Sequence, residues 1–194
     1  MNGRRLILAI GVVVFVVIVS IIIFRIDWGG SKAVQEIVRP VNIADYADTD
    51  VKVLMSTRSY INSNQEHQVL NITVGRDQTV GELINGYQGD VVRTERTGSN
   101  PTSYRAFLSA LHNAQFTKSQ LPPTGVQYDG VCPTGSRYTF EFIGAGEDGP
   151  ASLWATSCGK KIGNFAGNLS GVKKLFNAQL PKEQFEALTA DTPF

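Results

Sequence analysis

The chain has 194 residues, with 18 basic side chains, 17 acidic side chains and a hydrophobic content of 42%. Arg4, Arg5 and Arg25 flank a long apolar run near the N-terminus, which leaves 15 basic against 17 acidic residues in the remaining segment, 26–194. This balance offers neither the basic face that nucleic acid requires nor a polybasic surface for anionic lipid. We therefore expect no nucleic-acid partner.

The apolar run, Leu6–Phe24, has 19 residues and contains no charge and no proline. As a helix it would span about 28 Å, close to the hydrocarbon thickness of a bilayer. It is longer than the roughly 7–15 apolar residues of a cleaved signal peptide, and no Ala-x-Ala-like site follows it closely. The run predicts an uncleaved signal-anchor helix in the lipid bilayer, with cleavage as the alternative. We expect Arg5, Arg25 and Trp28 at its membrane interfaces.

This helix would divide the chain into a cytoplasmic tail (1–5), a transmembrane segment (6–24), a juxtamembrane linker (25–50) and an extracytoplasmic domain (51–194). Basic residues occur on both sides of the helix, so the positive-inside bias does not decide its orientation. An N-terminal tail in the cytoplasm with an exported C-terminal domain is the commoner arrangement. The expected location is therefore the cell membrane, crossed once.

Six later segments have the composition of strands, and most of them alternate apolar and polar residues between turn-forming clusters. They are Val51–Ile61, His67–Arg76, Gln78–Tyr87, Asp90–Thr97, Ser136–Gly144 and Ala151–Cys158. The first pair and the last pair are each joined by a polar or glycine-rich turn, which indicates antiparallel hairpins. The charges of the fourth segment indicate an edge strand.

Helical patterns follow the fourth and the sixth strand segments. Asn100 and Pro101 form a helix start, and Tyr104, Phe107, Leu108 and Leu111 then repeat at the spacing of one helix face. Nearer the C-terminus, Asn168 or Ser170 would cap a short helix that Pro181 ends, and another short turn follows. The sequence thus predicts an α+β fold: an antiparallel sheet of about six strands, with one main amphipathic helix and short C-terminal helices packed on it.

The two cysteines, Cys132 and Cys158, lie on either side of the last predicted hairpin. Their positions centre on residue 145, inside the turn-rich segment Gly144–Pro150, so antiparallel pairing would bring the two thiols together. Opposite residues in such a pair have Cα atoms about 4.5–5.5 Å apart, within disulfide reach. We predict a Cys132–Cys158 disulfide, with two unrelated buried thiols as the alternative. The bond needs an oxidising compartment, which places residues 26–194 outside the cytoplasm.

No motif for catalysis, cofactor binding or metal binding stands out. His67 and His112 are the only histidines, and neither has the spacing of a zinc ligand. Neither a G-x-S-x-G elbow nor a phosphate-binding G-x-x-x-x-G-K-[ST] loop is present. We expect no cofactor, no metal and no catalytic residue. A pocket that joined Asp129, His112 or Glu141 would instead favour a hydrolase.

Three segments, Tyr104–Phe116, Cys132–Phe142 and Leu153–Gly159, contain a CPxGxxY strand and a later WxxxC. In these segments the chain resembles uncharacterised bacterial single-pass membrane proteins that have an N-terminal anchor and a small exported domain. The resemblance covers residues 50–190 approximately. It implies a bacterial host and export, and it implies no activity.

These observations favour a membrane-anchored extracytoplasmic domain that binds a ligand or associates with the cell envelope without catalysis. Its partner would be an envelope or membrane protein. Two alternatives stay open: an envelope hydrolase with an unrecognised active site, and an accessory subunit of a membrane complex held through residues 6–24.

Overall fold

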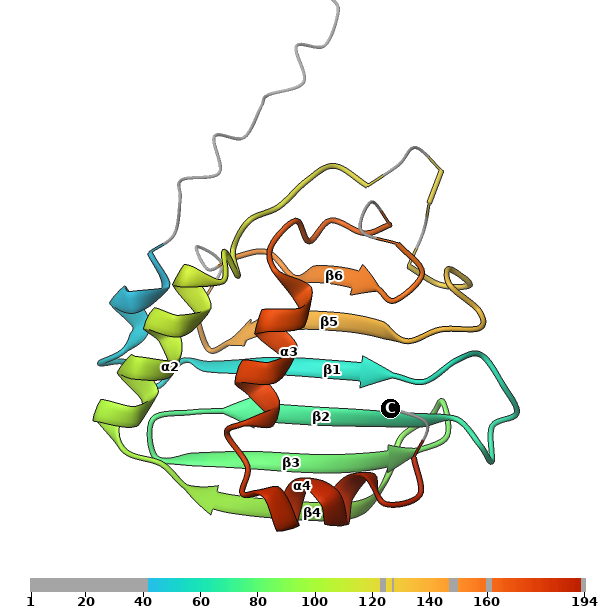
Figure 1. The fold of residues 1–194 in the computed structure, drawn as a ribbon, viewed down its shortest axis with the longest axis horizontal. Helices are drawn as coiled ribbons and strands as arrows, with labels where there is room; N and C mark the ends of the chain where they lie inside the picture. Colours follow the sequence, from blue (N-terminus) through green and yellow to red (C-terminus); the bar gives the residue numbers. More distant parts are fainter. Residues whose placement is uncertain (1–41, 123–124, 127, 147–149, 160–161, 193–194) are drawn as a thin grey trace, which may run out of the picture. The chain divides into compact units, whose positions relative to one another are not determined.

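A computed structural model describes residues 42–192, apart from 123–124, 127, 147–149 and 160–161. Its centre is a six-stranded antiparallel sheet with the strand order β4-β3-β2-β1-β5-β6 (Figure 1). The strands are β1 (Lys52–Arg58), β2 (Gln68–Val74), β3 (Gln78–Asn85), β4 (Asp90–Gly98), β5 (Arg137–Ile143) and β6 (Leu153–Thr156). The predicted α+β fold and its antiparallel sheet are confirmed, with strand ends a few residues inside most of the predicted limits.

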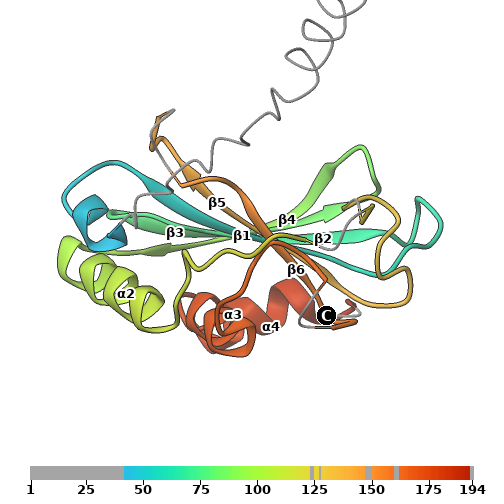
Figure 2. The same ribbon diagram turned by 90° about the horizontal axis from the view of Figure 1, so that it is seen from above.

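The described chain has three α-helices. Helix α2 (Pro101–Asn113) lies between β4 and β5 in the sequence, and α3 (Leu169–Asn177) and α4 (Lys182–Thr189) follow β6. All three lie on the same side of the sheet, and no helix of the described chain lies on the other side (Figure 2). We call these two sides the covered face and the open face. The predicted packing of one main helix and short C-terminal helices on the sheet is therefore confirmed.

The strand registers assign side chains to the two faces. Met55 of β1 lies between Ile72 of β2 and Phe140 of β5, and all three are buried in the core beneath the helices. Since side chains alternate along a strand, their neighbours in sequence point to the open face. Lys52, Leu54, Ser56 and Arg58 of β1 are in this second set.

The centre of the core is aromatic. Phe116, in the loop after α2, is fully buried and contacts Phe140, Phe142, Phe165 and Phe176 through ring pairs whose centroids are 5.3–6.4 Å apart. The rings come from β5, α3 and two loops. Such pairs stabilise a fold by about 0.5–1.5 kcal/mol each beyond their buried area. Phe116 therefore links the sheet to α3 although it lies outside any helix.

Helix α4 approaches β3 closely because Gly81 has no side chain. A Cβ atom at this position would lie 2.5 Å from Leu188 Cδ1 and 2.7 Å from Leu180 Cδ1. Leu188 and Leu180 are both buried in the core. Gly81 is thus the position at which the sheet accepts α4.

Helix α2 starts as its sequence predicts. The Asn100 side chain accepts a hydrogen bond from the Ser103 backbone N–H, and the Ser103 hydroxyl accepts one from the Asn100 N–H. This reciprocal capping satisfies two of the free donors at the helix start. Further along, the buried Tyr104 hydroxyl donates to the Val51 carbonyl at 2.6 Å, and burial raises the pKa of Tyr104 to about 12.

The core begins before residue 51, the expected end of the linker. A 3₁₀ helix, η1 (Ile43–Tyr46), contacts α2, and Ile43 and Ala47 are buried in the core. The sequence prediction missed them because one short helical turn carries no periodic pattern. The predicted membrane helix, 6–24, lies outside the described residues. Within the described part of the chain, no helix is long and apolar enough to cross a bilayer.

Candidate functional site

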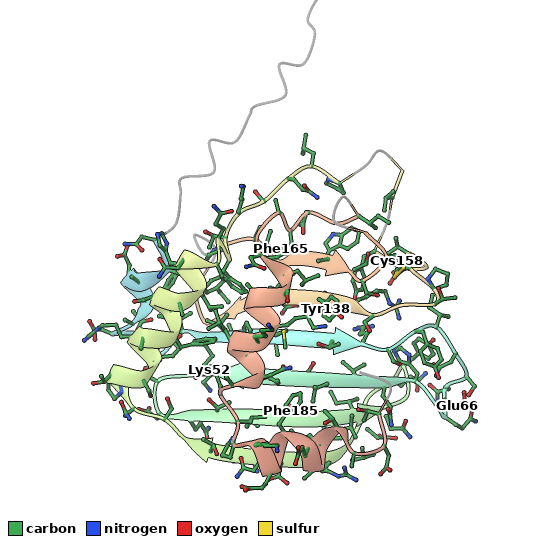
Figure 3. All side chains as sticks on the ribbon, in the orientation of Figure 1. Lys52, Glu66, Tyr138, Cys158, Phe165 and Phe185 are labelled. Carbon is green, nitrogen blue, oxygen red and sulfur yellow. A yellow bond between two sulfur atoms is a disulfide. The ribbon has the colours of Figure 1, made fainter. Side chains whose placement is uncertain are left out.

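The predicted disulfide is present. Cys132 and Cys158 are bonded, with Cα atoms 5.7 Å apart, at the end of the β5–β6 hairpin, where Figure 3 labels Cys158. The register behind the prediction was wrong, however. Paired positions of β5 and β6, such as Arg137 and Thr156, sum to 293, whereas the cysteines sum to 290. By this register the position opposite Cys158 is Gly135, three residues after Cys132.

A tight turn closes that gap of three residues. The Gly135 N–H donates to the Cys132 carbonyl at 3.1 Å, and Cys132 has a left-handed φ of 53°. A Cβ atom on Gly135 would lie 2.7 Å from Cys132 Sγ and 3.2 Å from Cys158 Sγ. The turn thus folds Cys132 back over a residue that has no side chain, and the disulfide fixes the start of β5 to the end of β6.

The other predicted positions do not form a site. Arg5, Arg25 and Trp28 lie outside the described residues. Asp129 lies in the loop before β5, His112 on α2 and Glu141 on the open face of β5, and all three side chains are exposed. The structure therefore does not show the buried pocket around these residues that would favour a hydrolase.

Two arginines lie opposite each other on the open face. Arg58 ends β1 and Arg137 begins β5, and the two are direct partners in the antiparallel ladder. Like charges in this position repel each other and destabilise a sheet. Arg137 is nevertheless only 4% exposed. We call Arg58, Arg137 and the aromatic residues over them, Tyr128 and Trp154, the arginine cluster.

Neither arginine forms an ion pair with any acid in the described part of the chain. Arg137 donates one hydrogen bond, from Nη2 to the Ser59 carbonyl at 3.3 Å. The Nε atoms of both arginines are buried and have no acceptor. By contrast, Arg105 pairs with Asp48 at 2.7 Å, and Arg76 lies within 3.9 Å of Asp50. A buried charge without a counter-charge is costly, so an outside anion would stabilise this pair.

Tyr128 packs across both guanidinium groups. Its ring centroid is 5.9 Å from the Cζ atoms of Arg58 and of Arg137, and its ring meets Trp154 edge-on at 5.5 Å. Burial raises the pKa of the Tyr128 hydroxyl, the charges of Arg58 and Arg137 partly oppose this rise, and the carboxylates of Asp129 and Glu141 add to it. The hydroxyl is buried and has no hydrogen-bond partner among the described residues. It is thus a neutral donor beside two cations.

His67 lies beside the cluster and is fully buried. Its ring stacks on Tyr87 with centroids 3.8 Å apart, and Nδ1 lies 3.4 Å from the Ser59 hydroxyl. Burial lowers the pKa of His67, the two arginines lower it further, and a backbone hydrogen bond at Tyr60 acts in the opposite direction. The imidazole is therefore neutral at neutral pH and adds no third positive charge.

This arrangement has the chemistry of an anion site. It combines positive charge, a buried phenol without a partner and two aromatic rings on the side of the sheet that no described helix covers. The terminal nitrogens of Arg58, unlike its Nε, are not among the buried unpaired atoms, and they form no hydrogen bond with a described residue. They are therefore open to a ligand. Carboxylate and phosphate groups match the planar fork of an arginine.

Local sequence patterns do not predict this cluster. Alternation along β1 places Arg58 on a polar face, which is a usable signal. The partnership with Arg137 depends on the pairing of β1 with β5, and three strands and α2 separate these two strands in the chain. A comparison with protein-family models gives no match for this chain, and a comparison with curated proteins gives no significant relative.

Proposed function

We propose that the chain is a membrane-tethered binding protein whose domain binds an oxyanion, a carboxylate or phosphate group of an envelope component, at the arginine cluster. The observation that carries the proposal is the Arg58–Arg137 pair, which has two cations opposite each other and no acid partner in the described chain. Exposed Arg58 nitrogens would make the first contact. Tyr128 and Trp154 would pack against the body of the ligand.

Two further observations support the tether and the compartment. Leu6–Phe24 has the length and composition of a membrane-spanning helix. The Cys132–Cys158 disulfide is compatible with a domain on the extracytoplasmic side, where such bonds persist. The domain would then meet envelope polymers, many of which have carboxylate or phosphate groups.

The test is a titration of the full-length protein in detergent micelles, observed through the Nε–Hε signals of its arginines. Inorganic phosphate and acetate are added separately, with chloride at equal ionic strength as the reference. We expect saturable shifts of the Arg58 and Arg137 signals with at least one probe. The Arg105 signal should stay in place, because Asp48 already pairs with that side chain.

Arg58→Gln is the informative variant, because Arg58 is partly exposed and its loss leaves the buried Arg137 in place. The variant should weaken binding of the effective probe by about tenfold or more, as expected for a charged hydrogen bond. Arg105→Gln is the matched control and should bind as the wild type does. Equal binding by wild type and Arg58→Gln, or no saturable shift with either probe, would refute the proposal.

A further inference from the structure

The covered face has a cleft of its own, between α3, α4 and the sheet. Its volume is about 260 Å³. Its lining residues are Met55, Thr57, Leu70, Ser136, Tyr138, Lys173, Asn177, Phe185 and Thr189. Figure 3 labels Tyr138 on β5 and Phe185 on α4, on this side of the sheet. The cleft and the arginine cluster therefore lie on opposite faces of β1 and β5.

Among the described residues that line the cleft, Lys173 alone is charged. Its Nζ donates to the Tyr138 hydroxyl oxygen at 2.7 Å and lies 4.4 Å from the centroid of the same ring. No acid of the described chain pairs with this ammonium group. Because Tyr138 accepts from lysine, its own O–H stays available as a donor, and the ammonium group keeps two further N–H donors. Three donors therefore remain unused at this position.

Other polar side chains in the cleft are unused as well. The side chains of Thr57, Ser136 and Asn177 form no hydrogen bond with any described residue. Thr57 is the most telling of them, because only 5% of its surface is exposed and it lies between Leu70 and Tyr138 in the ladder. Its hydroxyl is not among the buried unpaired groups of the described chain, so it is open to water in the cleft, and a bound ligand would replace that water.

The C-terminus of α3, which lies beside the cleft, does not cancel the positive charge of Lys173. Helix α3 ends at Asn177, and a helix C-terminus has about half a negative charge. Its last four carbonyls, those of residues 174–177, already accept hydrogen bonds from residues 178–180. The full charge of Lys173 exceeds this partial and largely satisfied one. The polar side of the cleft is therefore suited to a single negative charge.

The rest of the cleft is apolar. Met55, Leu70 and Phe185 provide carbon surface, and the two residues on the sheet are buried. A volume of about 260 Å³ has room for several water molecules or for a small organic acid.

We propose that this cleft binds a small monocarboxylate, with the carboxylate on Lys173 and the Tyr138 hydroxyl and the aliphatic part over Met55, Leu70 and Phe185. Thr57 donates to the second carboxylate oxygen or to a hydroxyl on the ligand. This site is separate from the arginine cluster, and its occupation does not depend on anion binding at the open face.

The chain offers a direct probe of the cleft, because Met55 is one of only two methionines. Full-length protein with ¹³C-labelled methionine methyl groups is titrated with hexanoate and, in parallel, with hexanamide, its uncharged analogue. Hexanoate should shift the Met55 signal in a saturable way, and hexanamide at the same concentrations should not. Saturation by hexanamide with equal affinity, or no saturable shift by hexanoate, would overturn the proposal.

Two variants locate the contact. Lys173→Gln should weaken hexanoate binding by about tenfold or more. Lys174→Gln is the matched control, because Lys174 is the next residue on α3, is exposed and is absent from the lining. Thr57→Val, which keeps the shape of the side chain, serves if Lys173→Gln unfolds, and it should weaken binding severalfold. Wild-type affinity for hexanoate in Lys173→Gln would refute the assignment. If Lys173→Gln unfolds, wild-type affinity in Thr57→Val would refute it. Arg58→Gln, on the open face, should leave the Met55 titration unchanged.

Discussion

The two faces of the sheet are made by the same strands and have opposite properties. On the covered face, Met55 and Phe140 are buried among helices, and aromatic rings fill the space around Phe116. On the open face, Arg58 and Arg137 oppose each other without an acid. The contrast shows where stability and binding are concentrated: the covered face contributes most of the apolar burial, and the open face keeps polar groups that the fold leaves unpaired.

The largest effect expected from this contrast comes from a pair of neighbours on β5. Phe140→Ala empties a site in the aromatic core and should reduce the free energy of unfolding by about 3–5 kcal/mol. Glu141→Ala, one residue further and exposed on the open face, should change it by no more than about 0.5 kcal/mol. Urea unfolding of the full-length protein in micelles measures both. Similar losses for the two variants would contradict the division into two faces.

A smaller effect should follow from closing the gap beneath α4. In Gly81→Ala the new methyl group meets Leu188 and Leu180, so α4 must shift, and stability should fall by about 1–3 kcal/mol. Gly98→Ala is the control, because a Cβ atom there has no heavy atom within 4 Å. This control should keep or slightly raise stability. If Gly81→Ala were as stable as Gly98→Ala, α4 would not pack on β3 as described.

The stability of the fold should depend on pH through His67. Because the pKa of His67 is lowered in the folded protein, the unfolded chain takes up the proton first as the pH falls. His67 therefore costs no stability above about pH 6.5 and reduces it below that value, by at most about 1.4 kcal/mol per pH unit.

This pH dependence is measured as the free energy of unfolding between about pH 7.5 and 5.5. His67→Gln should flatten the curve, whatever its own effect on stability. The same curve in His67→Gln and in the wild type would rule out His67 as its source.

The smallest effect on stability is expected at the arginine cluster. Arg58→Gln removes one of two opposed cations, so the free energy of unfolding should rise or stay within about 0.5 kcal/mol of the wild type. Arg105→Gln, which removes an acid-paired arginine, should lower it by about 0.2–1 kcal/mol. Urea unfolding distinguishes the two. A loss above 1 kcal/mol in Arg58→Gln would mean that this arginine supports the fold.

Sequence patterns predicted the parts of the fold that depend on local spacing. The alternation in β1 and the helical stripe from Tyr104 to Leu111 identify buried faces without knowledge of what covers them. Asn100 caps α2 as predicted, and Asn168, one of the two caps predicted beside Ser170, caps α3. Local chemistry therefore accounts for the elements and for most of their inward-facing residues.

The two candidate sites required information that no local pattern contains. Arg58 meets Arg137 only because β5 adds to the free edge of β1, and Lys173 meets Tyr138 only because α3 crosses β5. The predicted cysteine pair is correct although the predicted strand register was wrong. The turn between Cys132 and Gly135 makes up the difference of three residues between the two registers. Pairing of distant segments decided each of these contacts.

The strand order also has a consequence for how the chain folds as it is made. β1 is the first strand to be synthesised and lies in the interior of the finished sheet. Strands β2, β3 and β4 can add to one of its edges in order, by successive hairpins. Its other edge stays unpaired until β5 has been made. The sequence separation is large: Arg137 at the start of β5 donates to the carbonyl of Ser59, just after β1, and the two residues are 78 positions apart. A growing chain therefore exposes one unpaired edge of β1 until the segment after α2 is complete, and during this period it most needs protection from other chains.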